Sequence, residues 1–402
     1  MSRLLITALL WLGAEVAQAQ STLTFTALPA LPDGGRYGMS YCQDQNYFYM
    51  LAGGSPATAY TSDIFRFDPA TNSWGSAAFS TGQVSPQRFG TAALFTSASG
   101  VSLIGTLNGA TVTTPVPTLQ SVRVSDGVLS LNYANPLPAA SAGVATWNGL
   151  LYAYGGQLAS GPYTDQLRVF NPSTSAWTTL APMPEAKTTY GAAVNGKIYA
   201  MGGYNGVLNS ARVDAYDIAT GQWQALGTLP TTVSNQAIAV QGEWLWLVGD
   251  FNVQSYLAAY NTRTGQLRTF TSNLPPRRNA AAAFRNNYLY VWGGNTASAN
   301  SSTLADMWRA DVSTVLAASP SALVPALRAY PNPSEAGRST LALPPDARRL
   351  EVLDALGRLV AAATLPPGAA EWAIDLGAQP TGIYLVRVHT SQGRSASCRV
   401  AH

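Results

Sequence analysis

A glycine pair that follows a short aromatic-rich run recurs along most of the chain, and this repeat constrains the fold more than any other feature. Clear copies are LAGG, YGG, MGG and WGG, and the weaker forms IGT and VGD fill the gaps between them. The first glycines stand at positions 53, 105, 155, 202, 249 and 293, so neighbouring copies are 44 to 52 residues apart. A regular period of this size predicts an array of similar structural units.

Three of the units also contain an aromatic residue that precedes a tryptophan by seven positions, and the fifth unit keeps the spacing with Tyr260 and Leu267. The pairs are Phe67 with Trp74, Phe170 with Trp177, and Tyr216 with Trp223. Turn-forming strings such as DPATNS and DIATGQ lie between the two members, which favours a tight hairpin. Alternating runs before the glycine pairs predict two more strands, joined in one unit by an Asn-Gly turn. Four short antiparallel strands in about 50 residues are typical of a propeller blade.

This combination of a glycine pair, an aromatic residue and a tryptophan resembles the kelch repeat, over about 295 of the 402 residues. The resemblance implies a β-propeller. The paired glycines are expected to let the second strand pass close under a neighbouring aromatic ring. The tryptophans are expected to fill the space between adjacent sheets. These residues are therefore interpreted as scaffold and not as a ligand site.

The ends of the repeat region fix the number of blades. The sixth unit has no tryptophan-containing fourth strand, whereas residues 22–28 form an unattached strand near the N-terminus. In this segment Phe25, Leu28 and Pro32 repeat the spacing found after the tryptophans. We expect it to complete blade six and leave no open blade. The predicted fold is all-β, a six-bladed kelch-type β-propeller over residues 20–318, followed by a small Ig-like β-sandwich.

The first residues predict a signal peptide, residues 1–19. Arg3 supplies its positive charge, an apolar run follows, and the cleavage pattern Ala-Gln-Ala places the cut between Ala19 and Gln20. The alternative, an anchored transmembrane helix, needs a longer apolar run, and no later segment reaches the required ~20 residues. We therefore expect an exported protein without a transmembrane segment. Cys42 and Cys398 lie near opposite ends of the chain and are interpreted as unpaired, buried apolar residues.

The pattern changes after a linker at residues 319–328. Residues 329–402 contain the motifs YPNP at 330–333, DALGR at 354–358 and GIYLVRV at 382–388. In this order they resemble the C-terminal sorting domain of the type IX secretion system. The resemblance implies a Gram-negative cell, passage through the periplasm, and the type IX machinery as a partner that carries the chain to the surface or releases it. The alternative is an Ig-like adhesive module that stays attached.

Composition excludes several kinds of chemistry. The only histidines, His389 and His402, lie in the tail, so the propeller cannot hold a Ser-His-Asp triad, a histidine zinc site or a copper radical centre. We expect no metal, no cofactor and no identifiable catalytic residues, although the loop carboxylates of Glu185 and Asp250 leave acid–base catalysis open. With 23 basic and 20 acidic residues the net charge is only +3, and a nucleic acid partner is not expected.

The function that we predict is a binding module for an extracellular glycan or protein. The alternatives are a carbohydrate-active enzyme of the sugar mutarotase or lyase type, and a purely structural surface protein. The ligand is expected at the mouth of the central channel, where the residues two places before each inner strand are Arg36, Arg88, Ser141, Thr189, Asn235 and Arg278. Loops on the same face add Tyr60, Tyr163, Tyr204, Asn205, Phe251 and Tyr256. The three arginines predict an anionic ligand. Alternatively, they tie neighbouring blades together through backbone carbonyls.

Overall fold

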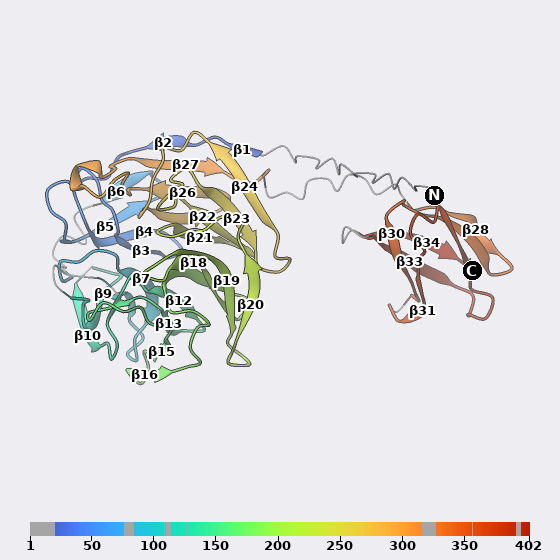
Figure 1. Cartoon of the computed structure of the whole chain (residues 1–402), viewed down its shortest axis with the longest axis horizontal. Helices are drawn as coiled ribbons and strands as arrows, with labels where there is room; N and C mark the ends of the chain where they lie inside the picture. The colour runs from blue at the N-terminus through green and yellow to red at the C-terminus, as the bar shows by residue number, and fades with distance from the viewer. Residues whose placement is uncertain are drawn as a thin grey trace, which may run out of the picture. The chain divides into compact units, whose positions relative to one another are not determined.

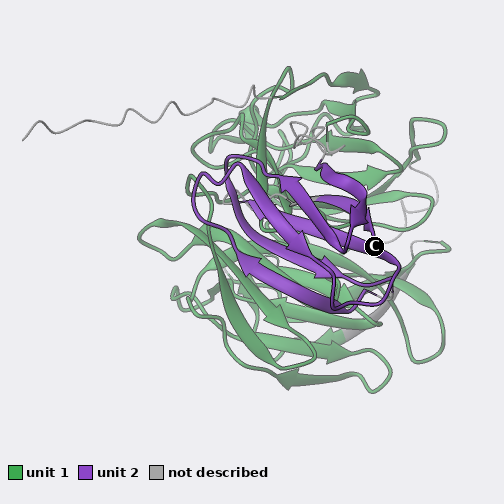
Figure 2. Ribbon diagram, turned by 90° about the vertical axis from the view of Figure 1, so that its right-hand side faces the viewer, with its two compact units in different colours: residues 1–315 green, residues 316–402 purple. Residues whose placement is uncertain are grey.

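The computed structural model describes residues 21–75, 84–107, 109, 114–126, 128–315, 327–355, 357–390 and 395–402. The expected signal peptide, the Ala19–Gln20 cleavage site and most of the expected linker lie outside these residues. The chain divides into two compact units, residues 1–315 and 316–402, which are coloured separately in Figure 2. Within the described residues, no helix has the length and apolarity that a membrane crossing requires.

The first unit contains six blades, and within each blade neighbouring strands along the chain pair in antiparallel fashion (Figure 1). Blade one contains β3 (Ser40–Gln43), β4 (Phe48–Gly53), β5 (Thr61–Asp68) and β6 (Ser73–Gly75). Blade two contains β7 (Thr91–Thr96), β8 (Ser102–Leu107), β9 (Thr118–Arg123) and β10 (Leu129–Ala134). Blade three contains β12 (Gly143–Trp147), β13 (Leu150–Tyr154), β15 (Leu167–Asn171) and β16 (Ala176–Thr179), beside the short pair β11 (Ala139–Ala140) and β14 (Gln157–Leu158).

The remaining blades follow the same order. Blade four contains β17 (Thr188–Val194), β18 (Lys197–Tyr204), β19 (Asn209–Asp217) and β20 (Gln222–Thr228). Blade five contains β21 (Ala237–Gln241), β22 (Trp244–Val248), β23 (Leu257–Asn261) and β24 (Leu267–Ser272). Blade six contains β25 (Ala281–Arg285), β26 (Tyr288–Trp292) and β27 (Met307–Asp311), with a short 3₁₀ helix, η1 (Asn300–Ser302), before β27. The first strands of the six blades form a closed ring around the channel. The six-bladed all-β fold is therefore confirmed.

The N-terminal segment joins two blades. Strand β2 (Thr26–Leu28) pairs with β27 and is the outer strand of blade six. Strand β1 (Ser21–Leu23) pairs in parallel with β24, which gives blade five a fifth strand that the sequence did not predict. Between them, Phe25 donates its N–H to Asn273 Oδ1 at 2.7 Å and accepts from Asn273 Nδ2 at 2.9 Å. One side chain thus replaces the strand pairing where the segment crosses between blades.

The repeated aromatic residues pack and hydrogen-bond between blades. The aromatic residue and the tryptophan of each clear unit lie opposite each other on paired strands. The tryptophan indole then donates to a carbonyl of the preceding blade, from Trp177 to Ala134 at 2.8 Å and from Trp223 to Ala181 at 2.9 Å. The tryptophans therefore fill space and also tie the outer rims of neighbouring blades together.

The first glycine of the pair is required by a backbone approach. Gly155, Gly202 and Gly293 have φ values of 60° to 66°, and a Cβ atom there would lie within 3.0 Å of a carbonyl oxygen of the next blade. The expectation that these glycines make room for an aromatic ring is wrong at these positions, because the closest neighbour is backbone. In blade one, Ala52 holds the equivalent conformation with φ of 55°. The position of the first glycine in the other blades is therefore occupied by Ala52, one residue before Gly53.

The second unit is a β-sandwich with its own core. One sheet contains β28 (Ala329–Glu335), β29 (Arg338–Ala342) and β32 (Glu371–Asp375). The other contains β30 (Ala347–Leu353), β31 (Leu359–Thr364), β33 (Ile383–Thr390) and β34 (Ser395–Ala401). Leu341 and Ile374 of the first sheet and Val352 and Val386 of the second belong to one buried apolar cluster. Cys42 and Cys398 are both free and partly exposed.

Candidate functional site

A chain of backbone hydrogen bonds surrounds most of the channel mouth. It joins five residues with φ between 53° and 57°, which we call the mouth ring: Gly38, Phe89, Ser141, Asn235 and Asn279. Ser141 donates its N–H to Phe89 O at 3.0 Å, and Phe89 donates to Gly38 O at 2.6 Å. Gly38 donates to Asn279 O and Asn279 to Asn235 O, both at 2.8 Å. Five of the six blades are thus connected at the start of their inner strands.

Blade four breaks the mouth ring. Thr189 stands at the equivalent position but has no positive φ, a conformation that is unfavourable for a β-branched residue. Its hydroxyl donates within its own blade, to Met201 O at 3.5 Å. Among the described residues, no backbone hydrogen bond joins Thr189 to Ser141 or to Asn235. The chain of hydrogen bonds that forms the mouth ring therefore has a gap between blades three and five, where Thr189 itself is buried.

A cavity of about 360 Å³ runs along the channel below the mouth ring. Tyr41 crosses this channel from blade one, donating to Ile238 O at 3.1 Å and accepting from Ile238 N at 2.9 Å on blade five. Burial raises the pKa of Tyr41 well above its usual range. Gln43 binds both backbone groups of Phe284 on blade six in the same manner. These two side chains satisfy inner-strand backbone groups that have no further strand to pair with.

In blades one, four and six, the residue two positions before the mouth-ring position is a buried cation. We call these residues, Arg36, Lys187 and Arg277, the clamp residues. Arg36 is 0% exposed and donates to Asp33 Oδ2 at 2.8 Å, to Ala52 O at 2.8 Å and to the Thr61 hydroxyl. Arg277 is also 0% exposed. It donates to Gly293 O and to Asp306 Oδ2, both at 3.0 Å. The prediction that Arg36 offers its guanidinium to a ligand is wrong, because every side of that group is occupied by the protein.

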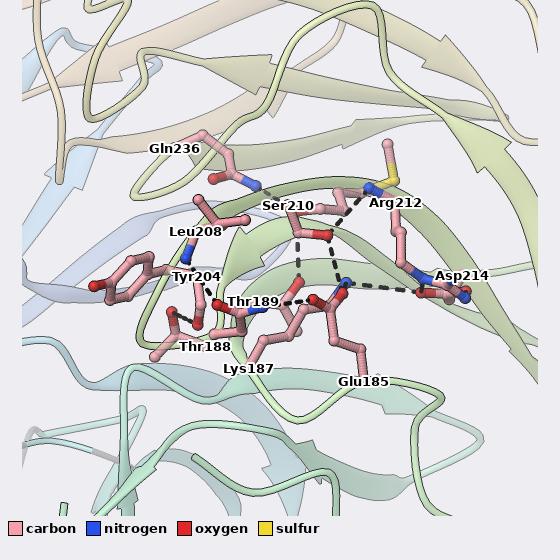
Figure 3. Close-up of polar contacts among 12 residues, drawn as sticks. Glu185, Lys187, Thr188, Thr189, Tyr204, Leu208, Ser210, Arg212, Asp214 and Gln236 are labelled. Atoms are coloured by element: carbon pink, nitrogen blue, oxygen red, sulfur yellow. Dashed lines mark hydrogen bonds and ion pairs between the residues drawn. The ribbon is translucent and has the colours of Figure 1, made fainter. Parts of the chain in front are cut away.

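Lys187 is the clamp residue of blade four, and Figure 3 shows the cluster around it. Its ammonium lies 3.2 Å from Glu185 Oε2 and 3.7 Å from Asp214 Oδ2. Asn205 and Ser210 also donate to Glu185, at 3.1 Å and 3.0 Å. Burial works to raise the pKa of Glu185, but the charge of Lys187 and these hydrogen bonds lower it overall. Asn205, predicted as a ligand contact, is therefore committed to Glu185.

Asp250, the other loop carboxylate, is committed as well. Its Oδ1 accepts from Ser234 N at 2.7 Å, and its Oδ2 accepts from the N–H groups of Asn252 and Val253. Both carboxylate oxygens of Asp250 are thus hydrogen-bonded to backbone N–H groups of the propeller. No group of three or more residues suited to a metal ion occurs in the described part of the chain.

The residue directly before the mouth-ring residue lies in a different environment from that of the clamp residues. In blade two it is Arg88, whose guanidinium donates to the Tyr37 hydroxyl and lies 4.9 Å from the centre of the Tyr60 ring. In blade six it is Arg278, which stacks on Phe251 at 4.2 Å and donates to the Ser298 hydroxyl at 3.3 Å. Within the described residues, neither arginine has a carboxylate oxygen within 4.0 Å. We call Arg88 and Arg278 the mouth arginines.

Blade one supplies Tyr37 between the two mouth arginines. Tyr37 holds the position that the sequence analysis gave to Arg36, and its hydroxyl donates to Asn300 at 3.0 Å. Sequence reasoning missed Tyr37 because it counted back from the first small residue of each inner strand. In blade one that residue, Gly38, is the mouth-ring residue itself, whereas in blade two Phe89 of the mouth ring precedes Gly90.

The four predicted tyrosines differ in their surroundings. Tyr60, Tyr163 and Tyr204 are partly exposed, and the rings of Tyr163 and Tyr204 meet edge to face with centres 5.7 Å apart. The hydroxyl of Tyr256 is buried without a partner among the described residues. Burial, aided by the charge of Asp250, raises the pKa of Tyr256 to about 12. Tyr60 thus belongs to the arginine side of the mouth, Tyr163 and Tyr204 form a separate pair, and Tyr256 is also partly exposed but has its hydroxyl buried.

Comparison with known proteins agrees with this geometry. Residues 138–184 and 191–230 match the Kelch motif, and residues 328–400 match the secretion system C-terminal sorting domain. Kelch-like protein terF of Aspergillus terreus is 28% identical over 170 residues, which are 38% of this chain and 35% of that protein. Kelch-like protein 7 of Rattus norvegicus is 31% identical over 113 residues, 27% of this chain and 19% of that protein. The chain thus matches about a third or less of the length of these relatives.

The solved structure of YjhT has the same fold. It is 16% identical in sequence, with a TM-score of 0.54, and the match covers 70% of this chain and 95% of that one. Together with the Kelch matches and the six blades, this defines a β-propeller built from kelch repeats. The chain as a whole is a kelch propeller with a type IX secretion system sorting domain at its C-terminus, and such a tail implies export to the cell surface or beyond.

Proposed function

We propose that the propeller is a binding module for an extracellular glycan or protein, and that the ligand presents an anionic group to Arg88 and Arg278. The observation that carries the proposal is the contrast in charge pairing. The clamp residues have carboxylate partners, whereas the mouth arginines have none within 4.0 Å among the described residues. Arg88 is partly exposed and Arg278 is 7% exposed, and an arginine at such a position that lacks an internal counter-ion favours an external one.

The aromatic contacts of the mouth arginines support the same proposal. Stacking on Phe251 and next to Tyr60 fixes the plane of each guanidinium. A stacked guanidinium still has N–H donors along its edge, which match the two oxygens of a carboxylate or a sulfate. Exposed Phe251 also offers an apolar face of the kind that packs against a sugar ring or a peptide side chain.

The alternative of a carbohydrate-active enzyme has less support. Glu185 and Asp250 were the carboxylates placed to act as acid or base, and each is held by donors from its own neighbourhood. A general acid near neutral pH needs a raised pKa, whereas the pKa of Glu185 is lowered. Binding without turnover is therefore the function that we favour.

The export route is a second part of the proposal. We infer that residues 1–19 are a signal peptide, that the propeller occupies residues 20–318, and that residues 329–402 direct a Gram-negative cell to pass the chain across its outer membrane. Removal of residues 322–402 should leave a folded propeller in the periplasm, which cell fractionation and immunoblotting would detect. Normal appearance of this truncated chain outside the cell would contradict the sorting role.

The binding proposal is tested with glycan and peptide arrays. The mature chain, residues 20–402, should bind acidic probes more strongly than neutral ones, and the double variant Arg88→Ala/Arg278→Ala should lose this binding. Arg263→Ala is the matched control, because Arg263 is exposed and pairs with Glu243 far from the mouth. The proposal is contradicted if the double variant has the same thermal stability and the same array profile as the wild-type protein.

A further inference from the structure

The gap in the mouth ring lies beside an unpaired polar group in the channel wall. Gln236 follows Asn235 of the mouth ring, is 4% exposed and lines the cavity. Its Nε2 donates to Met201 O of blade four at 2.7 Å. Its Oε1 has no hydrogen-bond partner among the described residues. A buried acceptor without a donor is costly, so a group that supplies a donor here gains that free energy.

The orientation of the Gln236 amide follows from its partner. A carbonyl oxygen can only accept, so the nitrogen of Gln236 must lie toward Met201. Figure 3 shows the nitrogen directed at the strands of blade four and the oxygen directed away from them. The open hydrogen-bonding position of Gln236 is therefore an acceptor, and it selects a ligand that donates.

The cavity wall restricts the ligand further. None of the described residues that line the cavity is charged. An ion would lose its hydration without gaining a counter-ion, so the channel favours a neutral ligand. The cavity wall also contains the amides of Asn235 and Asn279, which are hydrogen-bonded to each other at 2.7 Å, and small apolar residues such as Ala192 and Ala239. At about 360 Å³ the cavity is within the ~300–1,000 Å³ range of small-molecule sites.

We propose that the channel at the gap in the mouth ring binds a neutral, hydroxyl-rich small molecule, a sugar or a cyclic polyol, which donates a hydroxyl hydrogen to Gln236 Oε1. A sugar offers several hydroxyl donors and acceptors for the amides and C–H faces for the alanines. This site is separate from the mouth arginines, neither of which lines the cavity. The proposal therefore does not depend on the anionic ligand proposed above.

The test uses saturation-transfer NMR on the mature chain with D-glucose, D-galactose and myo-inositol as probes at millimolar concentration. We expect transfer to at least one of the three. Gln236→Leu should reduce the transfer at least about fivefold, as the loss of one hydrogen bond implies. Gln241→Leu is the matched control, because Gln241 also has an unpaired Oε1 but does not line the cavity. It should leave the transfer unchanged.

A second variant covers a possible folding defect. Ala192 lines the cavity from blade four and is partly exposed, so Ala192→Leu should fill the channel and abolish transfer without touching Gln236. The proposal is overturned if no probe shows transfer to the wild-type protein, since water then satisfies the Gln236 oxygen. It is also overturned if transfer persists in folded Gln236→Leu or in Ala192→Leu.

Discussion

Arg277 and Arg278 are neighbours in the chain, yet they belong to two regions with opposite roles. Arg277 lies in the clamp layer, fully buried, with its guanidinium on Asp306 and on the Gly293 carbonyl. Arg278 lies at the mouth, stacked on Phe251 and without a carboxylate partner in the described part of the chain. Both side chains are largely buried, so the two positions differ in charge pairing: within the described residues Arg277 has an internal counter-ion and Arg278 has none.

The difference comes from the alternation of side chains in the segment before the mouth ring. Neighbouring side chains of an extended segment point to opposite sides, and blade four keeps its clamp residue Lys187 although Thr189 has no positive φ. The side chain two places before the mouth-ring position enters the space between blades, where the clamp residues lie. The side chain one place before that position reaches the mouth. The role of each arginine is therefore set by its distance from the mouth-ring residue.

The largest expected effect is on stability, and it distinguishes the two regions directly. Arg277→Ala leaves Asp306 without its partner and should lower the free energy of unfolding by about 3 kcal/mol. Arg278→Ala removes a stacking contact and a hydrogen bond to Ser298 but leaves no carboxylate unpaired, and it should cost less, about 1–2 kcal/mol. Urea unfolding of the mature chain, followed by tryptophan fluorescence, measures both. If the two variants unfold at the same urea concentration, the distinction between clamp and mouth is wrong.

A smaller effect is expected from the pH dependence of the blade-four clamp. The pKa of Glu185 is lower in the folded chain than its ordinary value of 4.5, so ionised Glu185 stabilises the fold above that pH. This stabilisation is lost as the pH falls through the folded-state pKa. Glu185→Gln should therefore be less stable than the wild-type protein at pH 7, and the difference should shrink below pH 4.5. A stability difference that does not change between pH 7 and pH 3 would contradict the ion pair with Lys187.

The smallest effect concerns what the mouth arginines contribute besides charge. Arg88→Lys keeps the charge but loses the planar group beside Tyr60 and Phe89. For the strongest array ligand we expect the affinity to fall by about two- to fivefold, as the loss of an exposed cation–π contact implies. Arg88→Ala should fall further. Equal affinities for the lysine and alanine variants would mean that charge has no part in binding.

The fold could be predicted from the sequence because its signals are periodic. The first glycine of a pair marks a place where a backbone carbonyl of the next blade leaves no room for a Cβ atom. Few other residue types can adopt the left-handed conformation at such a place. The aromatic residue and its tryptophan pair across a hairpin of fixed length. Such requirements recur in most blades, so they are visible as a repeat even where a blade departs from it, as with Ala52 in blade one and Leu267 in blade five.

The site could be predicted only in part because the mouth ring has no fixed residue type. Its left-handed positions hold glycine, phenylalanine, serine and asparagine, so no single residue type identifies them in the sequence. Counting from the first small residue found Arg88 and Arg278 but assigned Arg36 to the mouth in place of Tyr37. The commitment of Asn205 to Glu185 depends on a contact between separate loops, which no local pattern encodes.

The most direct test of the central claim is a crystal structure of the mature chain with its strongest array ligand. We expect the anionic group of that ligand within hydrogen-bonding distance of the Arg88 or the Arg278 guanidinium, with Arg36 and Arg277 still on their present carboxylate partners. A ligand that is bound with its anionic group away from both mouth arginines would contradict the claim, and so would one that displaces Asp33 or Asp306 from a clamp residue.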